Sequence, residues 1–215
     1  MRTADFELLK RMIAERGREH RCLTAIAGAP GVGKSTLAAR LVAALQADEP
    51  DSAAILAMDG FHYDDAVLEA RGERARKGAP HTFDVGGLKA MLARLRANDE
   101  AAVAVPIFDR SIEIARAGAA IIGRPVRHVI VEGNYLLLDE APWRDLHRFF
   151  DLTVMVEVPE LLLRRRLELR WRHLPLDERL LKLECNDLPN GRLVTERSIG
   201  ADVVFHGDAE TDRSS

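Results

Sequence analysis

The segment GAPGVGKS at residues 28–35 fits the phosphate-binding Walker A pattern GxxxxGK[ST]. In this pattern the glycines let backbone N–H groups turn inward around phosphate oxygens. Lys34 is then expected to reach the β- and γ-phosphates of a nucleotide, and the Ser35 hydroxyl is expected to bind Mg²⁺. A helix starting here would also point its partially positive N-terminus at the phosphates, with Thr36 near the α-phosphate. The residues expected around the phosphates are Gly28, Ala29, Pro30, Gly31, Val32, Gly33, Lys34, Ser35 and Thr36.

Two carboxylates each stand at the end of an apolar run. Asp59 follows residues 53–58, and Glu132 closes the run VIVE. Phosphoryl transfer to a hydroxyl needs a carboxylate that accepts the proton, so Asp59 is the candidate catalytic base. A turn or helix cap is the structural alternative for Asp59. Glu132 has the Walker B arrangement and is the candidate ligand of the nucleotide's Mg²⁺, unless it is simply an acid that ends a strand.

A cluster of arginines lies in the segment LLLRRRLELRWRH at residues 161–173. On a helix, Arg166 and Arg170 share a face at a spacing of four residues, whereas Arg164 and Arg165 point elsewhere. Arginines on a closing lid would stabilise charge on a transferring phosphoryl group and exclude water. We therefore expect a helical lid over residues 160–184, with Arg166 catalytic and Arg170 bound to the nucleotide. A solvated basic surface is the alternative.

The remaining pattern of the chain predicts an α/β domain that positions these groups. Apolar strand-like runs cover residues 22–27, 53–58, 102–107, 126–131, 152–158 and 203–205. Amphipathic helical patterns lie between them and over residues 4–17, and residues 110–122 read as a hairpin or a strand pair. Strands of this kind indicate a central parallel sheet covered on both faces. We expect one P-loop NTPase domain over residues 1–215, a three-layer α/β/α sandwich with ligands at the carboxyl ends of its strands.

Composition excludes several classes of function. The net charge of −3 argues against a nucleic-acid or anionic-membrane binder. No run is apolar over a membrane-spanning length, and the first residues lack the apolar core of a signal peptide. The two cysteines, Cys22 and Cys185, belong to no metal or redox motif, which is typical of reduced thiols in the cytoplasm. Among nucleotide-binding classes, the chain carries neither the NKxD guanine motif nor a transporter LSGGQ signature.

Taken in order, the motifs resemble a known family. GAPGVGKST, MDGFHYDD, RKGAPHTFD, PIFDR, VIVEGNY and the arginine segment are similar to those of the uridine kinase, phosphoribulokinase and type I pantothenate kinase superfamily, from Leu23 to at least Arg170. The resemblance implies an ATP- and Mg²⁺-dependent kinase acting on a hydroxyl of a small molecule. By this resemblance Asp59 matches the catalytic aspartate, which also lies near Mg²⁺, and Glu132 matches the metal-binding acid of the EG motif.

The substrate motifs depart from the uridine kinase pattern. The segment KGAPHTFD at residues 77–84 looks closer to the pantothenate kinase version. A tyrosine of the family is replaced by Phe108 and a histidine by Glu113, and the C-terminal region that closes over pantothenate is missing. The chain looks most like small bacterial members described as nucleoside/nucleotide kinase-like or fructose-transport-system kinases, which implies a sugar or sugar-like acceptor.

The expected contacts of this acceptor are polar or aromatic residues in loops, for which ordinary loop polarity is the alternative: His62, Tyr63, Phe83, Asp109 and Arg110. Asn190, in the segment NDLPNGRLV, is expected either to contact adenine or to belong to a plain turn.

Two rival functions stay open at this point, and so does a homodimer. A nucleoside monophosphate or cofactor-precursor kinase would need further basic residues near the acceptor, which Arg71, Arg74, Arg76 and Lys77 could supply. A regulatory ATP-binding switch would instead act on a protein partner, such as a transporter, with little turnover.

Overall fold

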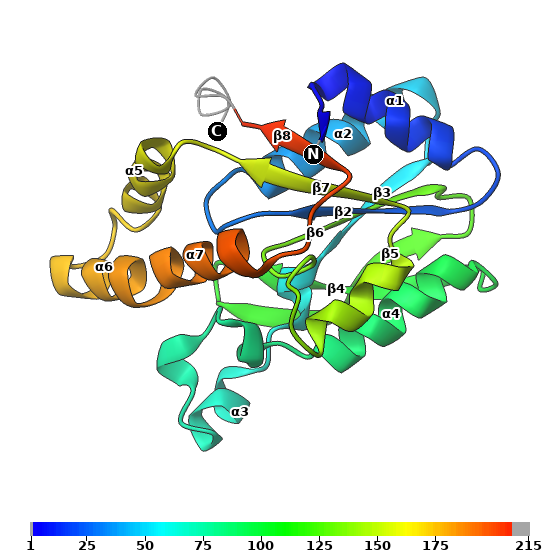
Figure 1. Ribbon diagram of the computed structural model, residues 1–215. Coiled ribbons are helices and arrows are strands. Elements are labelled where there is room, and N and C mark those ends of the chain that lie inside the picture. The colour runs from blue at the N-terminus through cyan, green and yellow to red at the C-terminus, as the bar shows by residue number, and fades with distance from the viewer. Residues whose placement is uncertain (1, 208–215) are drawn as a thin grey trace.

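A central parallel sheet organises the chain, as the computed structural model shows for residues 2–207 (Figure 1). Its six strands have the order β1-β8-β7-β2-β6-β3. They are β1 (Arg2–Thr3), β2 (Cys22–Ala27), β3 (Ala53–Ala57), β6 (His128–Gly133), β7 (Leu152–Glu157) and β8 (Val203–His206). The strands predicted from apolar runs are present with ends that differ by at most a few residues. The α/β fold class with a central parallel sheet is confirmed.

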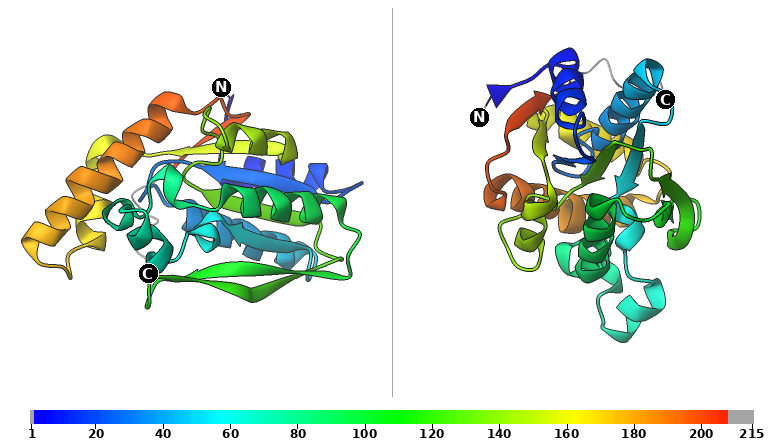
Figure 2. Two further views of the ribbon diagram at one scale, coloured as in Figure 1. Left: turned by 90° about the horizontal axis from the view of Figure 1, so that it is seen from below. Right: turned by 90° about the vertical axis from the view of Figure 1, so that its right-hand side faces the viewer.

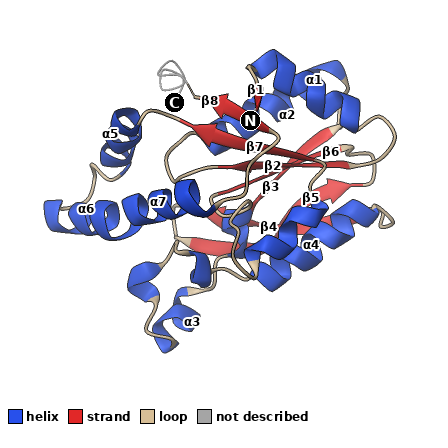
Figure 3. Cartoon of the chain, viewed as in Figure 1, coloured by secondary structure: helices blue, strands red, loops and turns tan. Residues whose placement is uncertain are grey.

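Helices cover both faces of this sheet (Figure 3). They are α1 (Phe6–Arg16), α2 (Lys34–Asp48), α3 (Asp65–Ala70), α4 (Val85–Ala97), α5 (Glu160–Arg170), α6 (Leu176–Lys182) and α7 (Leu188–Arg197). Short 3₁₀ turns span Met58–Phe61, Arg74–Arg76, Pro80–Thr82 and Trp143–Phe149, and a π-helical turn spans Leu183–Asp187. The expected N-terminal helix over residues 4–17 corresponds to α1, which begins after the N-cap Asp5, whose side chain accepts from the Leu8 N–H.

Two apolar cores, one on each face, hold the layers together. On one face α1 and α2 bury Leu9, Ile13, Leu37 and Leu41 against the sheet. On the other face α4 buries Leu88, Leu92 and Leu95, which recur every three or four residues and so form one helical stripe. Because near-continuous apolar strands such as β2 are buried on both faces, the sheet must be sandwiched between helices.

The segment predicted as a hairpin lies outside the central sheet. Strands β4 (Ala102–Asp109) and β5 (Ile114–Gly123) pair antiparallel with each other and form a second sheet of two strands. Figure 2 shows this hairpin alongside the main sheet. Two predictions are corrected here. Residues 110–122, predicted as a hairpin or a strand pair, form a turn and the single strand β5. The strand predicted at residues 102–107 pairs with β5 instead of joining the central sheet, and its Val103 and Val105 join the core under α4.

Three helices extend from the carboxyl end of β7 and form what we call the helical arm, residues 160–197 (Figure 1). Helix α5 is followed by a nearly continuous helical run from α6 through the π-turn to α7. The arm includes residues 160–184, the segment predicted as a lid. It returns to the body of the molecule at α7, where Gly191 approaches Ala29 of the glycine-rich loop.

His128, at the start of β6, makes the stability of the fold depend on pH. The residue is 4% exposed, and its Nδ1 has no hydrogen-bond partner among the described residues. Burial, with a smaller effect of Arg127, lowers the pKa of His128, and Glu49 opposes this weakly. Since the unfolded chain then binds the proton more tightly, this contribution to stability is complete above about pH 6.5 and is lost as the pH falls.

We therefore expect the free energy of unfolding to decrease between pH 7 and pH 5, and His128→Asn to reduce the slope. Urea titrations at several pH values measure the free energy of unfolding and its slope with pH. His206→Asn, a substitution of an exposed histidine, is the matched control and should keep the wild-type slope. An equal slope in wild type and His128→Asn would contradict the assignment.

Candidate active site

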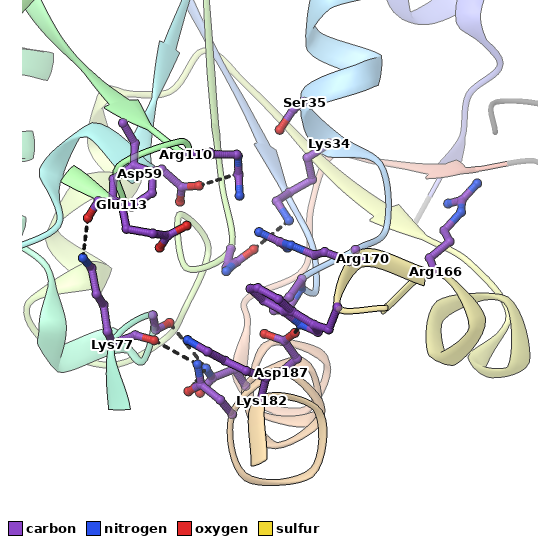
Figure 4. A pocket seen from close by; sticks show the side chains of 18 of the residues that line it. Lys34, Ser35, Asp59, Lys77, Arg110, Glu113, Arg166, Arg170, Lys182 and Asp187 are labelled. Atoms are coloured by element: carbon purple, nitrogen blue, oxygen red, sulfur yellow. Dashed lines mark hydrogen bonds and ion pairs between the residues drawn. The ribbon is translucent and has the colours of Figure 1, made fainter. Parts of the chain in front are cut away.

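A cavity of about 1170 Å³ opens at the carboxyl ends of β2, β3 and β6. It is bounded by the glycine-rich loop, by the β4–β5 hairpin and by the helical arm (Figure 4). Lys34, Asp59 and Glu132, which are far apart in the sequence, all line it. The cavity therefore lies at the edge of the sheet where ligands are expected.

The glycine-rich loop has the backbone that a phosphate cradle requires. Gly28, Gly31 and Gly33 have φ values of 153°, 84° and 98°, a region that L side chains rarely adopt. A side chain at Gly31 would also collide with Leu167 of α5, because its Cβ would lie 2.9 Å from Leu167 Cδ2. These dihedral angles suit a loop whose N–H groups turn towards a phosphate, and α5 packs directly on the loop.

Lys34 is the buried cation of the cavity. Its ammonium group donates to Gly28 O at 3.0 Å, to Ala29 O at 2.9 Å and to Asn134 Oδ1 at 2.7 Å. Burial lowers the pKa of Lys34 to about 8, although the nearby charges of Glu132 and Asp59 act in the opposite direction. Burial disfavours the charged form of Lys34, and the negative charge of bound phosphate oxygens would stabilise that form. Lys34 therefore fits an anionic ligand.

Glu132, Ser35 and Asp59 line the same cavity as Lys34. Glu132 is 7% exposed. Burial, and then the charge of Asp59, raise the pKa of Glu132, whereas Lys34 and the Ser35 hydroxyl lower it. Two carboxylates and a hydroxyl in this arrangement fit Mg²⁺, because the ion prefers oxygen ligands and keeps several waters. A divalent cation here would also offset the repulsion between the two acids.

Asp59 lies in the 3₁₀ turn that follows β3, with its side chain about a quarter exposed. Its Oδ2 accepts a hydrogen bond of 2.9 Å from Arg110 Nη2 at the end of β4. The two residues are separated by 51 positions in the sequence, so the turn after β3 and the hairpin must be brought together by the fold. The carboxylate that could accept a proton thus stands at the meeting point of two elements.

Comparisons with known proteins agree with this geometry. A solved structure described as a "putative fructose transport system kinase" from Silicibacter sp. TM1040 superimposes with a TM-score of 0.85 at 41% identity, covering 94% of this chain and 98% of that one. The "putative uridine kinase C227.14" of Schizosaccharomyces pombe is 30% identical over 210 residues, which are 93% of this chain and 88% of the relative. The chain belongs to the P-loop kinases of the uridine kinase and pantothenate kinase type. It is an ATP-dependent small-molecule kinase.

Other relatives match over part of their length. The Escherichia coli protein YggC is 38% identical over 69% of this chain but only 61% of its own length. The pantothenate kinase of Sorangium cellulosum is 38% identical over 63% of this chain and 44% of its own length. The family model of the methylmalonyl-CoA mutase-associated GTPase MeaB matches residues 2–63, the part that carries the glycine-rich loop and Asp59.

On the acceptor side of the kinase pocket, aromatic rings form one wall. The His62 ring lies 4.0 Å from that of Phe83 and 4.8 Å from that of Phe108, centroid to centroid. His62 Nδ1 also donates to the Asp59 carbonyl at 2.8 Å, and burial lowers the pKa of His62. Of the predicted acceptor contacts, His62, Phe83 and Arg110 line the pocket.

The structure does not bring Tyr63 and Asp109 to this pocket, as far as the described residues show. The Arg71 guanidinium stacks on the Tyr63 ring, with Arg71 Cζ 4.4 Å from the ring centroid. The Asp109 carboxylate accepts from Ser111 N at 3.1 Å and from Ser111 Oγ at 2.6 Å, and so stabilises the hairpin turn. The prediction that Tyr63 and Asp109 contact the acceptor is therefore corrected, because each side chain is held by a partner away from the pocket.

The two predicted lid arginines lie on α5 and take different positions (Figure 4). Arg170 reaches towards Lys34, whereas Arg166 points away from the centre of the pocket and its Nη1 donates to Val32 O at 3.1 Å. Both line the pocket. The catalytic role of Arg166 and the closing motion of the arm stay predictions.

Asn190 occupies the floor of the pocket and is 3% exposed. Its Nδ2 donates to Asn186 Oδ1 at 3.1 Å and to Gly78 O at 3.4 Å. The alternative of a plain turn is wrong, since α7 begins at Leu188 and runs through the segment, with Pro189 in its first turn. An adenine contact of Asn190 stays a prediction.

Sequence reasoning missed several residues of the kinase pocket. Asn134 directly follows the predicted metal-binding acid and its glycine, so its position after a strand could have indicated it. Asn186 and Asp187 lie in the π-turn, and Trp171 Nε1 donates to Asp187 Oδ2 at 2.6 Å. Burial raises the pKa of Asp187, and Trp171 opposes this. The segment that begins with these two residues was singled out from the sequence, but only Asn190 was chosen within it, because the return of the arm decides which side chains reach the pocket.

One further finding concerns the chain as a whole. Within residues 2–207, no helix is both long and apolar enough to cross a lipid bilayer.

Proposed function

We propose that this kinase transfers the γ-phosphoryl group of ATP, with Mg²⁺, to a hydroxyl of a sugar or sugar-like alcohol. The observation that carries the proposal is the convergence of Lys34, Glu132 and Asp59 on one pocket whose opposite side is lined by aromatic and amide groups. The first three are the parts that phosphoryl transfer needs: a phosphate-binding cation, a metal ligand and a base.

In the proposed mechanism the chain positions the reactants and moves one proton. Lys34 and the loop N–H groups would hold the phosphates, and Ser35 with Glu132 would hold Mg²⁺, which neutralises charge on the phosphate oxygens. Asp59 would accept the proton of the acceptor hydroxyl as its oxygen bonds to the γ-phosphorus and the bond to the bridging oxygen breaks, releasing ADP. Arg170 would stabilise negative charge on the oxygens of the transferring group.

The acceptor side supports a neutral polyhydroxyl molecule over a phosphorylated one. Of the basic residues that a phosphorylated acceptor could use, the buried Lys77 is held by partners within the chain. Lys77 Nζ contacts Asp65 Oδ1 and Glu113 O, each at 2.6 Å. Arg74 pairs with Asp65 at 2.7 Å, and Arg76 donates to Cys185 O at 2.6 Å. In contrast, the aromatic wall of His62, Phe83 and Phe108 offers ring faces that suit a sugar.

The test is ADP release from Mg-ATP with a panel of sugars, sugar alcohols, nucleosides, pantothenate and nucleoside monophosphates. We expect one or a few neutral polyhydroxyl acceptors to raise turnover well above the background. A nucleoside monophosphate as the best acceptor would refute the sugar assignment and favour the first rival. Nucleotide-dependent binding of a protein partner with a flat panel would favour the regulatory switch.

A further inference from the structure

Arg110 occupies a position between the predicted base and the phosphate-binding lysine. Its guanidinium donates to Asp59 Oδ2 at 2.9 Å, and Figure 4 shows it between Asp59 and Lys34. It also lies close enough to Lys34 and Glu132 for its charge to lower the pKa of both groups. The side chain therefore stands beside the place where a γ-phosphate held by Lys34 would lie, although it comes from the hairpin.

The ion pair between Arg110 and Asp59 is exposed and therefore weak. The side chains of Arg110 and Asp59 are 55% and 25% exposed, and a pair this accessible contributes little stability. A guanidinium binds phosphate oxygens well because its N–H groups can contact two oxygens at once. Exchange of the Asp59 carboxylate for a phosphate should therefore be favourable.

The pair also affects the proposed chemistry at Asp59. While Asp59 Oδ2 accepts from Arg110, that oxygen is occupied and is less accessible to an acceptor hydroxyl. Movement of Arg110 to another anion would leave Oδ2 open to the acceptor.

We propose that Arg110 exchanges Asp59 for the γ-phosphate of bound ATP, so that nucleotide binding both recruits a catalytic arginine from the hairpin and releases the base. This inference rests on the proposed role of Asp59. It reassigns Arg110 from the acceptor, where the sequence pattern placed it, to the transferring phosphoryl group. ADP lacks the group that would displace Asp59, so the exchange distinguishes ATP from ADP.

The experiment measures the binding of a non-hydrolysable ATP analogue and of ADP, each with Mg²⁺, by titration calorimetry without any acceptor. We expect Arg110→Gln to weaken the analogue at least about tenfold, or about 1.4 kcal/mol, and to change ADP affinity by less than about twofold. Arg116→Gln is the matched control. It lies on the same hairpin, pairs with Asp109 at 3.5 Å and does not line the pocket, so it should change neither affinity.

Arg110→Gln could weaken binding of the analogue in two ways: by loss of a contact with the phosphate, or by repulsion between the phosphate and an unpaired Asp59. The same substitution made in the Asp59→Asn variant distinguishes the two. In Asp59→Asn no carboxylate is left to repel the γ-phosphate, and Arg110→Gln should still weaken the analogue about tenfold. Loss of this effect in the double variant would overturn the proposal, as would equal weakening of the analogue and ADP, or unchanged affinity for the analogue. Because no acceptor is present, a wrong sugar assignment does not alter these outcomes, and thermal melting confirms that each variant is folded.

Discussion

Replacing Asp59 with asparagine is expected to lower kcat by about two to four orders of magnitude while ATP still binds. Asparagine keeps the size of the side chain and an oxygen that can accept from Arg110, but it cannot take a proton from the acceptor hydroxyl. The loss should therefore fall on the transfer step. Steady-state kinetics with the acceptor found in the panel, together with calorimetric ATP binding, measure the two effects separately.

Asp64→Asn is the matched control for this substitution. The Asp64 side chain caps α3 by accepting from the Ala66 N–H at 2.9 Å, and it does not line the pocket. Because asparagine is also a good N-cap residue, this variant should retain nearly full activity. Turnover of Asp59→Asn within a few-fold of wild type would show that another group is the base, even if the P-loop assignment holds.

Replacing Lys34 with alanine is expected to damage both nucleotide binding and transfer, each by about two to three orders of magnitude. Lys34 is the cation that the glycine-rich loop buries, and its three oxygen partners would lose their donor. Calorimetry with ATP and kinetics with the identified acceptor measure the two losses. Lys34→Met, which keeps the length of the side chain, separates the loss of charge from the cavity. Unaltered ATP affinity would refute the assignment of this loop.

Lys89→Ala provides a surface control for the Lys34 substitution, since the Lys89 ammonium pairs at 2.7 Å with the exposed Asp145 and lies outside the pocket.

ATP binding of the wild type should also depend on pH. With the pKa of Lys34 near 8 in the unliganded chain, and raised by a bound phosphate, binding takes up a proton above that pH. The affinity is therefore expected to fall as the pH rises beyond about 8, and to do so less in Lys34→Met.

The groups that bind phosphate and metal could be predicted because each depends on a short stretch of sequence. The loop at residues 28–35 is contiguous, and Asp59 and Glu132 follow apolar strands whose carboxyl ends meet at one edge of a parallel sheet. The strand order itself was not needed for that prediction, since any parallel arrangement brings these ends together.

The acceptor side could not be predicted in the same way, because it depends on contacts between distant segments. Asn186 donates to Lys77 O across 109 positions, and the hydroxyl of Tyr135 donates to Gly78 O across 57. Which of two neighbours faces the pocket also follows from the exact bend of a loop, as Tyr63 beside His62 shows. Motifs indicate that residues near 62 and 110 matter, but they do not say which side chain points inward.

The separation of the β4–β5 hairpin from the main sheet has an evolutionary consequence. Among the described residues the hairpin forms its own two-stranded sheet, yet its Phe108 and Glu113 line the pocket. Mutations in this hairpin can reshape the acceptor side without shifting the register of the strands that carry the phosphate-binding loop. A lineage can thus change the residues that meet the acceptor while the backbone of the phosphate-binding loop stays as it is.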